Sequence, residues 1–169
     1  KIAEFTSRTI QSVLIPRAQL EFACTREELR NVGIYFLFAE GTSGSLPLLY
    51  VGEAEDCATR LKQHNKQKDW WTVAIVCISK TAEFTKSHVK FLEWHCHQQA
   101  GEAGRFKLEN SSTPTKSHVS ESMEADLMDH FDTIRTLAST LGYPLFDRIK
   151  KAKTKDKLTC KGKKALATG

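Results

Sequence analysis

Two tyrosines and an arginine–histidine pair are the residues whose types and spacing could do chemistry. Tyr35 ends the tripeptide Gly33-Ile34-Tyr35, and Tyr50 opens Tyr50-Val51-Gly52. Arg60 follows ten residues after Tyr50, and His64 comes one helical turn later, on the same face of a helix. The guanidinium of an arginine presents a fixed fork of donors that matches phosphate oxygens. A phenol has a pKa of about 10, so nearby cations must lower it before a tyrosine acts as a base at neutral pH.

The stretches around these residues have the patterns of two strands and a helix. Residues 33–39 are β-branched and aromatic, as in a buried strand, and residues 46–52 read as the returning strand after a polar turn. This hairpin would place the two tyrosines on adjacent strands, where cross-strand side chains meet. Residues 55–67 have apolar side chains at helical spacing, and this helix carries Arg60 and His64.

The rest of the chain adds strands and two longer helices. Residues 72–79 are too short and too β-branched for a helix, and residues 10–15 could form a short strand. Helices are expected from a Thr85 cap to about residue 103 and over 120–141, with a polar loop between them. The order predicts an α/β (α+β) fold, a small sandwich with a three-stranded central sheet flanked by helices. A doubly wound fold would need more parallel strands.

Length and charge indicate one domain followed by a basic tail. A chain of 169 residues with 40% apolar residues is an ordinary globular domain, and no run of about 18 apolar residues predicts a membrane span. The net charge of +5 is uneven: the segment 148–164 holds nine Lys or Arg residues and one acid, whereas residues 1–147 carry a net charge of −3. We therefore expect a domain at 1–147 and a Lys-rich linker or disordered tail at 148–169. Overall basicity alone does not argue for a nucleic-acid partner.

The cysteines argue for a reducing compartment. There are five, an odd number, and no CxxC pair is present, so neither a disulfide framework nor a zinc ribbon is indicated. We expect reduced thiols and a cytoplasmic location.

The two tripeptides and the spacing to the Arg–His pair resemble the GIY-YIG nuclease family. The similarity includes the whole segment 49–64 and extends over roughly residues 10–146, with a motif core at 33–110. Residues 68–93 are similar to a bacterial subgroup whose nuclease domain is typically followed by a second small domain, so we expect a C-terminal domain that this chain lacks. The family pattern implies a Glu on a later helix, matched by Glu93, and an Asn beyond it, matched by Asn110.

The resemblance implies a divalent-metal-dependent endonuclease that hydrolyses DNA phosphodiester bonds by in-line attack of water. It implies a tyrosine general base, with Tyr35 and Tyr50 as candidates, and a carboxylate, Glu93, that holds Mg²⁺ or Mn²⁺. One carboxylate with phosphate oxygens and waters is an ordinary Mg²⁺ shell. His64 would contact phosphate or relay a proton, and Asn110 would orient a ligand or the DNA backbone.

Basic side chains near these residues predict a DNA-binding surface. They are Arg60, Lys62, Lys66, Lys68, Lys86 and Lys90. The first four would form one positive helix edge, and the last two lie four residues apart on the helix of Glu93. The basic tail would add salt-sensitive attraction. RNA stays open as an alternative to DNA.

Two other functions fit the same residues. A catalytically inactive nucleic-acid-binding module that retains the fold would bind DNA without metal-dependent cleavage, and a protein-interaction scaffold would not bind nucleic acid. The presence of Arg60, His64 and Glu93 together favours the enzyme. Glu53 stands where the family often has a small hydroxyl, and it adds either metal or proton chemistry or nothing.

Overall fold

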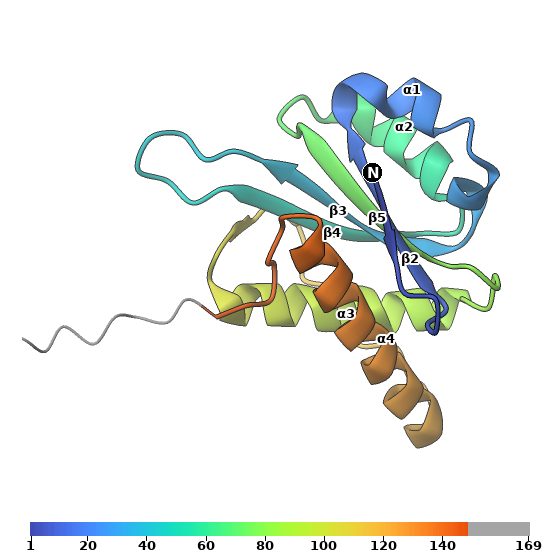
Figure 1. Ribbon diagram of the computed structural model, residues 1–169. Helices are drawn as coiled ribbons and strands as arrows, with labels where there is room; N and C mark the ends of the chain where they lie inside the picture. Colours follow the sequence, from blue (N-terminus) through green and yellow to red (C-terminus); the bar gives the residue numbers. More distant parts are fainter. Residues whose placement is uncertain (149–169) are drawn as a thin grey trace, which may run out of the picture.

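The computed structural model describes residues 1–148, and its centre is one mixed sheet with helices on both faces (Figure 1). The strands are β1 (Ile2–Glu4), β2 (Ile10–Pro16), β3 (Gly33–Ala39), β4 (Leu48–Ala54), β5 (Val73–Ser79) and β6 (Lys107–Leu108). Their order across the sheet is β1-β2-β5-β3-β4-β6. Neighbouring strands are antiparallel except β4 and β6, which are parallel. The predicted tail lies outside the described residues, apart from Arg148.

Two pairs of helices cover the two faces of the sheet (Figure 1). On one face lie α1 (Leu20–Ala23) and α2 (Cys57–Gln67), with short 3₁₀ turns at Arg17–Gln19 and Glu27–Arg30. On the other face lie α3 (Lys86–Ala103) and α4 (Glu121–Thr140). This confirms the predicted mixed α and β class, and it separates the Arg60 helix from the Glu93 helix by the thickness of the sheet.

The sheet has six strands, so the predicted number of three is wrong. The predicted three are its centre, β5-β3-β4, and β2 pairs with β5 along its whole length, from Ile10 opposite Ser79 to Pro16 opposite Val73. The edge strands β1 and β6 have three and two residues. Segments this short are too brief to display a period-two pattern, and only their partner strands define them.

Local signals set the ends of the helices as expected. The Thr85 hydroxyl accepts a hydrogen bond from the His88 amide at the start of α3, and the Ser120 hydroxyl accepts one from the Met123 amide at the start of α4. At α2 the cap is Asp56, whose carboxylate accepts from the Thr59 amide at 2.8 Å. The helix that carries Arg60 therefore begins two residues later than predicted.

Side chains alternate between the two faces along β3 and so form two separate cores. Ile34, Phe36 and Phe38 pack toward α3 and α4, whereas Tyr35 and Leu37 pack toward α2. The tyrosine of the first tripeptide thus lies beneath α2, on the opposite face of the sheet from α3.

Two further expectations concern membranes and thiols. Among the described helices none is both long and apolar enough to cross a membrane. The four cysteines within residues 1–148 are all buried and free. The fifth, Cys160, lies outside the described residues.

Candidate active site

The hairpin of β3 and β4 places the two tyrosines on the same face as diagonal neighbours. Tyr35 is opposite Gly52 and Leu37 is opposite Tyr50, and the two tyrosine ring centroids are 6.2 Å apart. The Tyr35 ring lies directly on Gly52: a Cβ added there would stand 2.4 Å from the Tyr35 hydroxyl oxygen. The glycine of the second tripeptide is required because the tyrosine of the first occupies the space of its side chain.

Tyr35 and His64 form a buried hydrogen-bonded pair. The Tyr35 hydroxyl lies 2.7 Å from His64 Nε2, and the two residues are 1% and 5% exposed. Burial lowers the pKa of His64 to about 4, and the charges of Lys68 and Arg60 act in the same direction. Burial, with the nearby Tyr50 hydroxyl, raises the pKa of Tyr35 above its ordinary value. The pair is therefore uncharged at neutral pH and joined by one hydrogen bond, whose direction depends on the imidazole tautomer.

Tyr50 lies at the boundary between this buried pair and solvent. It is half-buried, its ring centroid is 5.3 Å from that of His64, and Lys68 Nζ lies 4.8 Å from its centroid. Burial raises the pKa of Tyr50, as does the charge of Glu93, while the Tyr35 hydroxyl and Arg60 act in the opposite direction. In this structure Tyr50 carries its proton at neutral pH.

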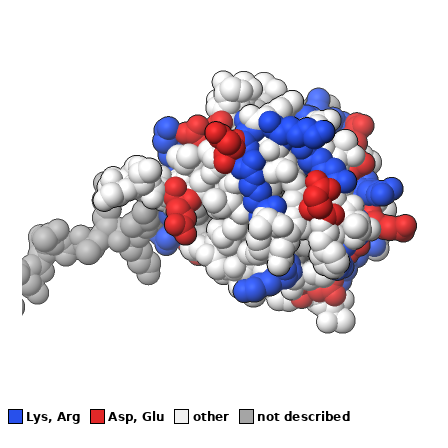
Figure 2. All heavy atoms as spheres, turned by 90° about the horizontal axis from the view of Figure 1, so that it is seen from above, with Lys and Arg blue, Asp and Glu red and all other residues white. Residues whose placement is uncertain are grey.

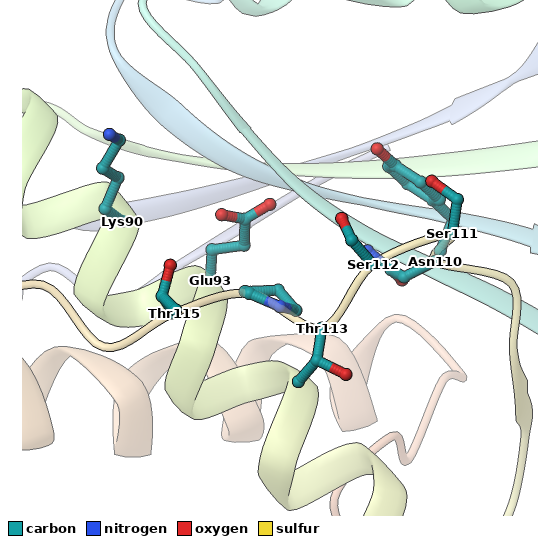
Figure 3. A pocket seen from close by; sticks show the side chains of 9 residues that line it. Lys90, Glu93, Asn110, Ser111, Ser112, Thr113 and Thr115 are labelled. Atoms are coloured by element: carbon teal, nitrogen blue, oxygen red, sulfur yellow. The ribbon is translucent and has the colours of Figure 1, made fainter.

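Glu93 meets Tyr50 at the open edge of β4. The short strand β6 pairs only with Leu48 and Leu49, so from Tyr50 onward β4 has β3 on one side and no paired strand on the other. A pocket of about 210 Å³ lies at this edge, and the Glu93 side chain rises into it from α3 (Figure 3). The residues that line it are Tyr50, Lys90, Glu93, Asn110, Ser111, Ser112, Thr113, Pro114 and Thr115. The phenol and the carboxylate therefore share one pocket, although the Tyr50 side chain packs on the α2 face of the sheet and Glu93 belongs to α3 on the opposite face.

The surroundings of Glu93 favour its protonated form. Burial and the neighbouring Glu53 carboxylate together raise the pKa of Glu93 to about 7, against the opposing charges of Lys86 and Lys90. A carboxyl group in this environment gains from a bound cation, because a cation offsets both the burial and the like charge.

Arg60 is exposed and free of acidic partners. Its Nη1 donates to Gln63 Oε1 at 3.2 Å, and within residues 1–148 no carboxylate forms an ion pair with it. It lines a second hollow of about 260 Å³ together with Lys86. Its charge still reaches the other groups, since it lowers the pKa values of both tyrosines and of Glu93 after the larger effect of burial.

Asn110 has a structural task that the sequence left open. Its Nδ2 donates to the Val51 carbonyl at 2.7 Å, and its Oδ1 accepts from the Val51 amide at 3.1 Å. The side chain thus continues the β4–β6 ladder by one step, after the Glu109 amide has bonded the Leu49 carbonyl. Asn110 therefore holds the pocket loop on β4, and its second Nδ2–H and second Oδ1 lone pair are not used by these two bonds.

The basic residues predicted to form one DNA-binding surface lie in different places. Lys62 Nζ lies 3.7 Å from the Glu21 carboxylate of α1, and Lys66 is one turn further along that same face of α2. Lys68 lies beside Tyr50, and Lys90 lines the Glu93 pocket. The face that carries α1 and α2 mixes Lys and Arg with Asp and Glu (Figure 2). The structure brings Lys68 and Lys90 to the site and leaves Lys62 and Lys66 outside it.

Two groups of residues near the site have contacts that the sequence did not predict. Glu53, only 13% exposed, forms an ion pair of 3.0 Å with Lys86, and Lys86 also reaches Glu55 at 3.7 Å. Lys86 is thereby committed to carboxylates. The hydroxyl-rich run from Ser111 to Thr115 forms a wall of the Glu93 pocket. Its five small polar and proline residues directly after Asn110 were the only sequence signal, and such runs are typical of ordinary loops.

The oxygen atoms that line the pocket are the kind of ligand that a hard cation prefers. Carboxylate and hydroxyl oxygens line it, and in the described part of the chain no three His, Cys, Asp or Glu side chains gather in a possible metal cluster. Mg²⁺ is ordinarily bound by one or two carboxylates with waters and substrate phosphates, whereas zinc takes four closely placed ligands. Glu93 therefore fits a Mg²⁺ or Mn²⁺ ion and does not fit zinc.

Comparison with known proteins identifies one related family. The family model described as the GIY-YIG catalytic domain matches residues 31–118, more than half of the chain. The match spans the hairpin, α2, β5, α3 and the pocket loop, and so includes the six predicted catalytic positions. No curated protein and no solved structure matches the chain.

Proposed function

The chain belongs to the GIY-YIG catalytic domain family, a family of nucleases, and on that premise we propose that it is a divalent-metal-dependent endonuclease hydrolysing DNA phosphodiester bonds. The observation that carries the proposal is the shared pocket of Tyr50 and Glu93 at the edge of β4, with Arg60 close enough for its charge to lower the pKa of both groups. A base, a metal-holding carboxylate and a phosphate-binding cation are the groups that attack of water on a phosphodiester needs.

Tyr50 is the tyrosine that would contact the attacking water. Tyr35 is 1% exposed and bonded to His64, so it has no access to substrate. Tyr50 must first release its own proton to solvent, which Arg60 favours by lowering its pKa against the effect of burial. In the proposed step the water oxygen bonds to phosphorus and the water proton passes to the Tyr50 oxygen. The bond from phosphorus to O3′ breaks, and the O3′ oxygen takes up a proton from a solvent water.

Glu93 would hold the divalent ion, and Arg60 would bind the phosphate. A Mg²⁺ or Mn²⁺ ion at this carboxylate supplies Lewis-acid stabilisation of the charge that develops on the phosphate and the leaving oxygen. The Arg60 fork would donate to non-bridging oxygens, and loss of one such donor typically lowers the rate on the order of 10²–10³ fold. Tyr35 and His64 are positioning residues, since their buried bond fixes the surface against which Tyr50 rests.

The test is nicking of supercoiled plasmid in the presence of Mg²⁺, with and without a chelator. We expect nicking by the wild type, loss on chelation, and a decrease on the order of 10²–10³ fold in Glu93→Ala and Arg60→Ala. Thermal melting of each variant serves as the control for folding. Undiminished nicking by a folded variant would remove that residue from the mechanism, and nicking that survives chelation would remove the metal.

The same assay separates the alternatives. Plasmid that is bound but never nicked would indicate the inactive binding module, and a matched RNA substrate decides between DNA and RNA. We also propose a cytoplasmic location, supported by the four free thiols within residues 1–148.

A further inference from the structure

The hydroxyl-rich loop beside Glu93 points to a second phosphate contact. We propose that Ser112, Thr115 and Lys90 form a phosphate-binding subsite, which holds the backbone phosphate next to the one that is cleaved. This inference rests on the proposed function, because it assumes that a nucleic-acid strand enters the Glu93 pocket.

The loop is held in place at both ends. Asn110 bonds both main-chain groups of Val51 at its start. At its end Lys116 Nζ pairs with the Glu124 carboxylate at 2.9 Å, and the Ser117 hydroxyl donates to the Ser87 carbonyl at 2.9 Å. The hydroxyls between these two anchors are therefore presented by a fixed backbone, which reduces the entropy lost when they bind a ligand.

The side chains of the loop point in different directions. Figure 3 shows the hydroxyls of Ser112 and Thr115 on the side of the Glu93 carboxylate, whereas the Thr113 hydroxyl points to the opposite side. Neither the Ser112 nor the Thr115 hydroxyl forms a hydrogen bond with any other described residue. Their donors are available to a ligand in the pocket.

Lys90 supplies the charge that a phosphate requires. Lys90 is exposed and lies with Thr115 on the side of Glu93 away from Ser112 (Figure 3). Within residues 1–148 no carboxylate forms an ion pair with it. Its neighbour one turn earlier, Lys86, is already paired with Glu53 and Glu55. Lysine and serine or threonine hydroxyls are among the groups that bind phosphate oxygens in DNA complexes.

The chemistry of the subsite determines what it can recognise. Its hydroxyls and its ammonium group suit phosphate oxygens, which are the same at every position of a strand. The subsite therefore binds the backbone without reading the sequence, and its loss affects all sequences equally.

The experiment compares two disabling variants with two matched controls. Lys90→Met and the double variant Ser112→Ala/Thr115→Val remove the subsite. Thr113→Ala removes a hydroxyl that points away, and Lys80→Met removes a lysine that bonds the Phe5 carbonyl and does not line the pocket. Binding of a fluorescent duplex is measured by anisotropy with Ca²⁺ in place of Mg²⁺ over a series of salt concentrations, and nicking kinetics are measured with Mg²⁺.

We expect each disabling variant to weaken binding about tenfold for every duplex sequence and to raise KM more than it lowers kcat. The salt slope of Lys90→Met should be shallower by about 0.9, the loss of one phosphate contact. Both controls should bind as the wild type does. Equal weakening by Thr113→Ala and the double variant, or an unchanged salt slope in Lys90→Met, would overturn the subsite.

The outcomes separate this inference from the proposed function. Wild-type protein that binds but does not nick, with weaker binding in the disabling variants, would retain the subsite and refute hydrolysis. Wild-type protein that nicks, with disabling variants that bind and nick normally, would retain hydrolysis and refute the subsite.

Discussion

The two tyrosines of the motif lie 6.2 Å apart between ring centroids, yet they belong to two different regions of the molecule. The buried region contains Tyr35 and Gly52 of the hairpin and His64 of α2, and all three are buried between the sheet and α2. The open edge contains Tyr50 and Glu93, in a pocket lined by hydroxyls. Identical side chains thus have different tasks, because one is excluded from water and the other borders it. The buried region fixes geometry, and the open edge is where we place the chemistry.

The largest expected effect contrasts the two tyrosines directly. Tyr50→Phe should lower the nicking rate on the order of 10²–10³ fold, as loss of a general base does, and leave the free energy of unfolding within about 0.5 kcal/mol. Tyr35→Phe should instead cost about 1–2 kcal/mol of stability, because the His64 imidazole loses its hydrogen bond to the Tyr35 hydroxyl. The nicking rate should fall less than in Tyr50→Phe. Nicking kinetics and denaturant unfolding of both variants give the comparison. A stable Tyr35→Phe protein as inactive as Tyr50→Phe would contradict the division.

Gly52→Ala tests the packing of the buried region. The new Cβ would stand 2.4 Å from the Tyr35 ring and hydroxyl, which are themselves enclosed, so we expect a loss of about 3 kcal/mol. The matched control is Gly101→Ala in α3, where a Cβ meets only Leu108 Cδ1 at 3.5 Å. That substitution should stabilise the helix by about 0.5–1 kcal/mol. The free energies of unfolding of both variants are measured by urea titration. Equal stability of the two variants would show that the Tyr35 ring can move away from the new Cβ.

Acid should weaken the buried region through His64. Its folded-state pKa of about 4 lies below the ordinary value of about 6.5, so the unfolded chain takes up the proton first. The stability contributed by the neutral imidazole is complete above pH 6.5 or so and is lost as the pH falls toward about 4, on the order of 2–3 kcal/mol. The groups around the His64 imidazole are two cations, Arg60 and Lys68, and two uncharged phenols, Tyr35 and Tyr50.

The control for this pH dependence is His64→Gln, which keeps an acceptor for Tyr35 and does not titrate. Unfolding free energies of both proteins are measured between about pH 7 and pH 4, so that effects of all other groups cancel in the difference. The wild type should lose more stability than the variant over this window. Parallel curves would mean that His64 is not buried as described.

The smallest effect concerns the Asn110 side chain, which bonds the pocket loop to Val51 of β4. Asn110→Ala removes two hydrogen bonds to Val51 and should lower stability by about 1 kcal/mol. Nicking should fall several-fold, because the pocket loop loses its anchor. Ser111→Ala, next in the same loop, is the control for stability and should melt as the wild type does. If Asn110→Ala melts unchanged but loses DNA binding, Asn110 is a ligand-contacting residue after all.

Spacing along the chain was sufficient to predict the buried strands, the helix that carries Arg60 and His64, and the caps at Thr85 and Ser120. These features depend on local chemistry, since side chains four residues apart share a helix face and a cap needs only the next turn. The two tripeptides also indicated that their tyrosines would be neighbours, which the hairpin register confirms.

Only the tertiary structure decided which groups are buried and which segments distant in sequence contact each other. No local pattern gives the short edge strands or the two hydrogen bonds of Asn110 to Val51. Because β6 ends after two residues, part of the edge of β4 is not covered by a strand, and there the Glu93 side chain shares a pocket with Tyr50. Burial and access arise from contacts between segments distant in sequence, so the same residue type becomes a buried support at position 35 and a solvent-facing group at position 50.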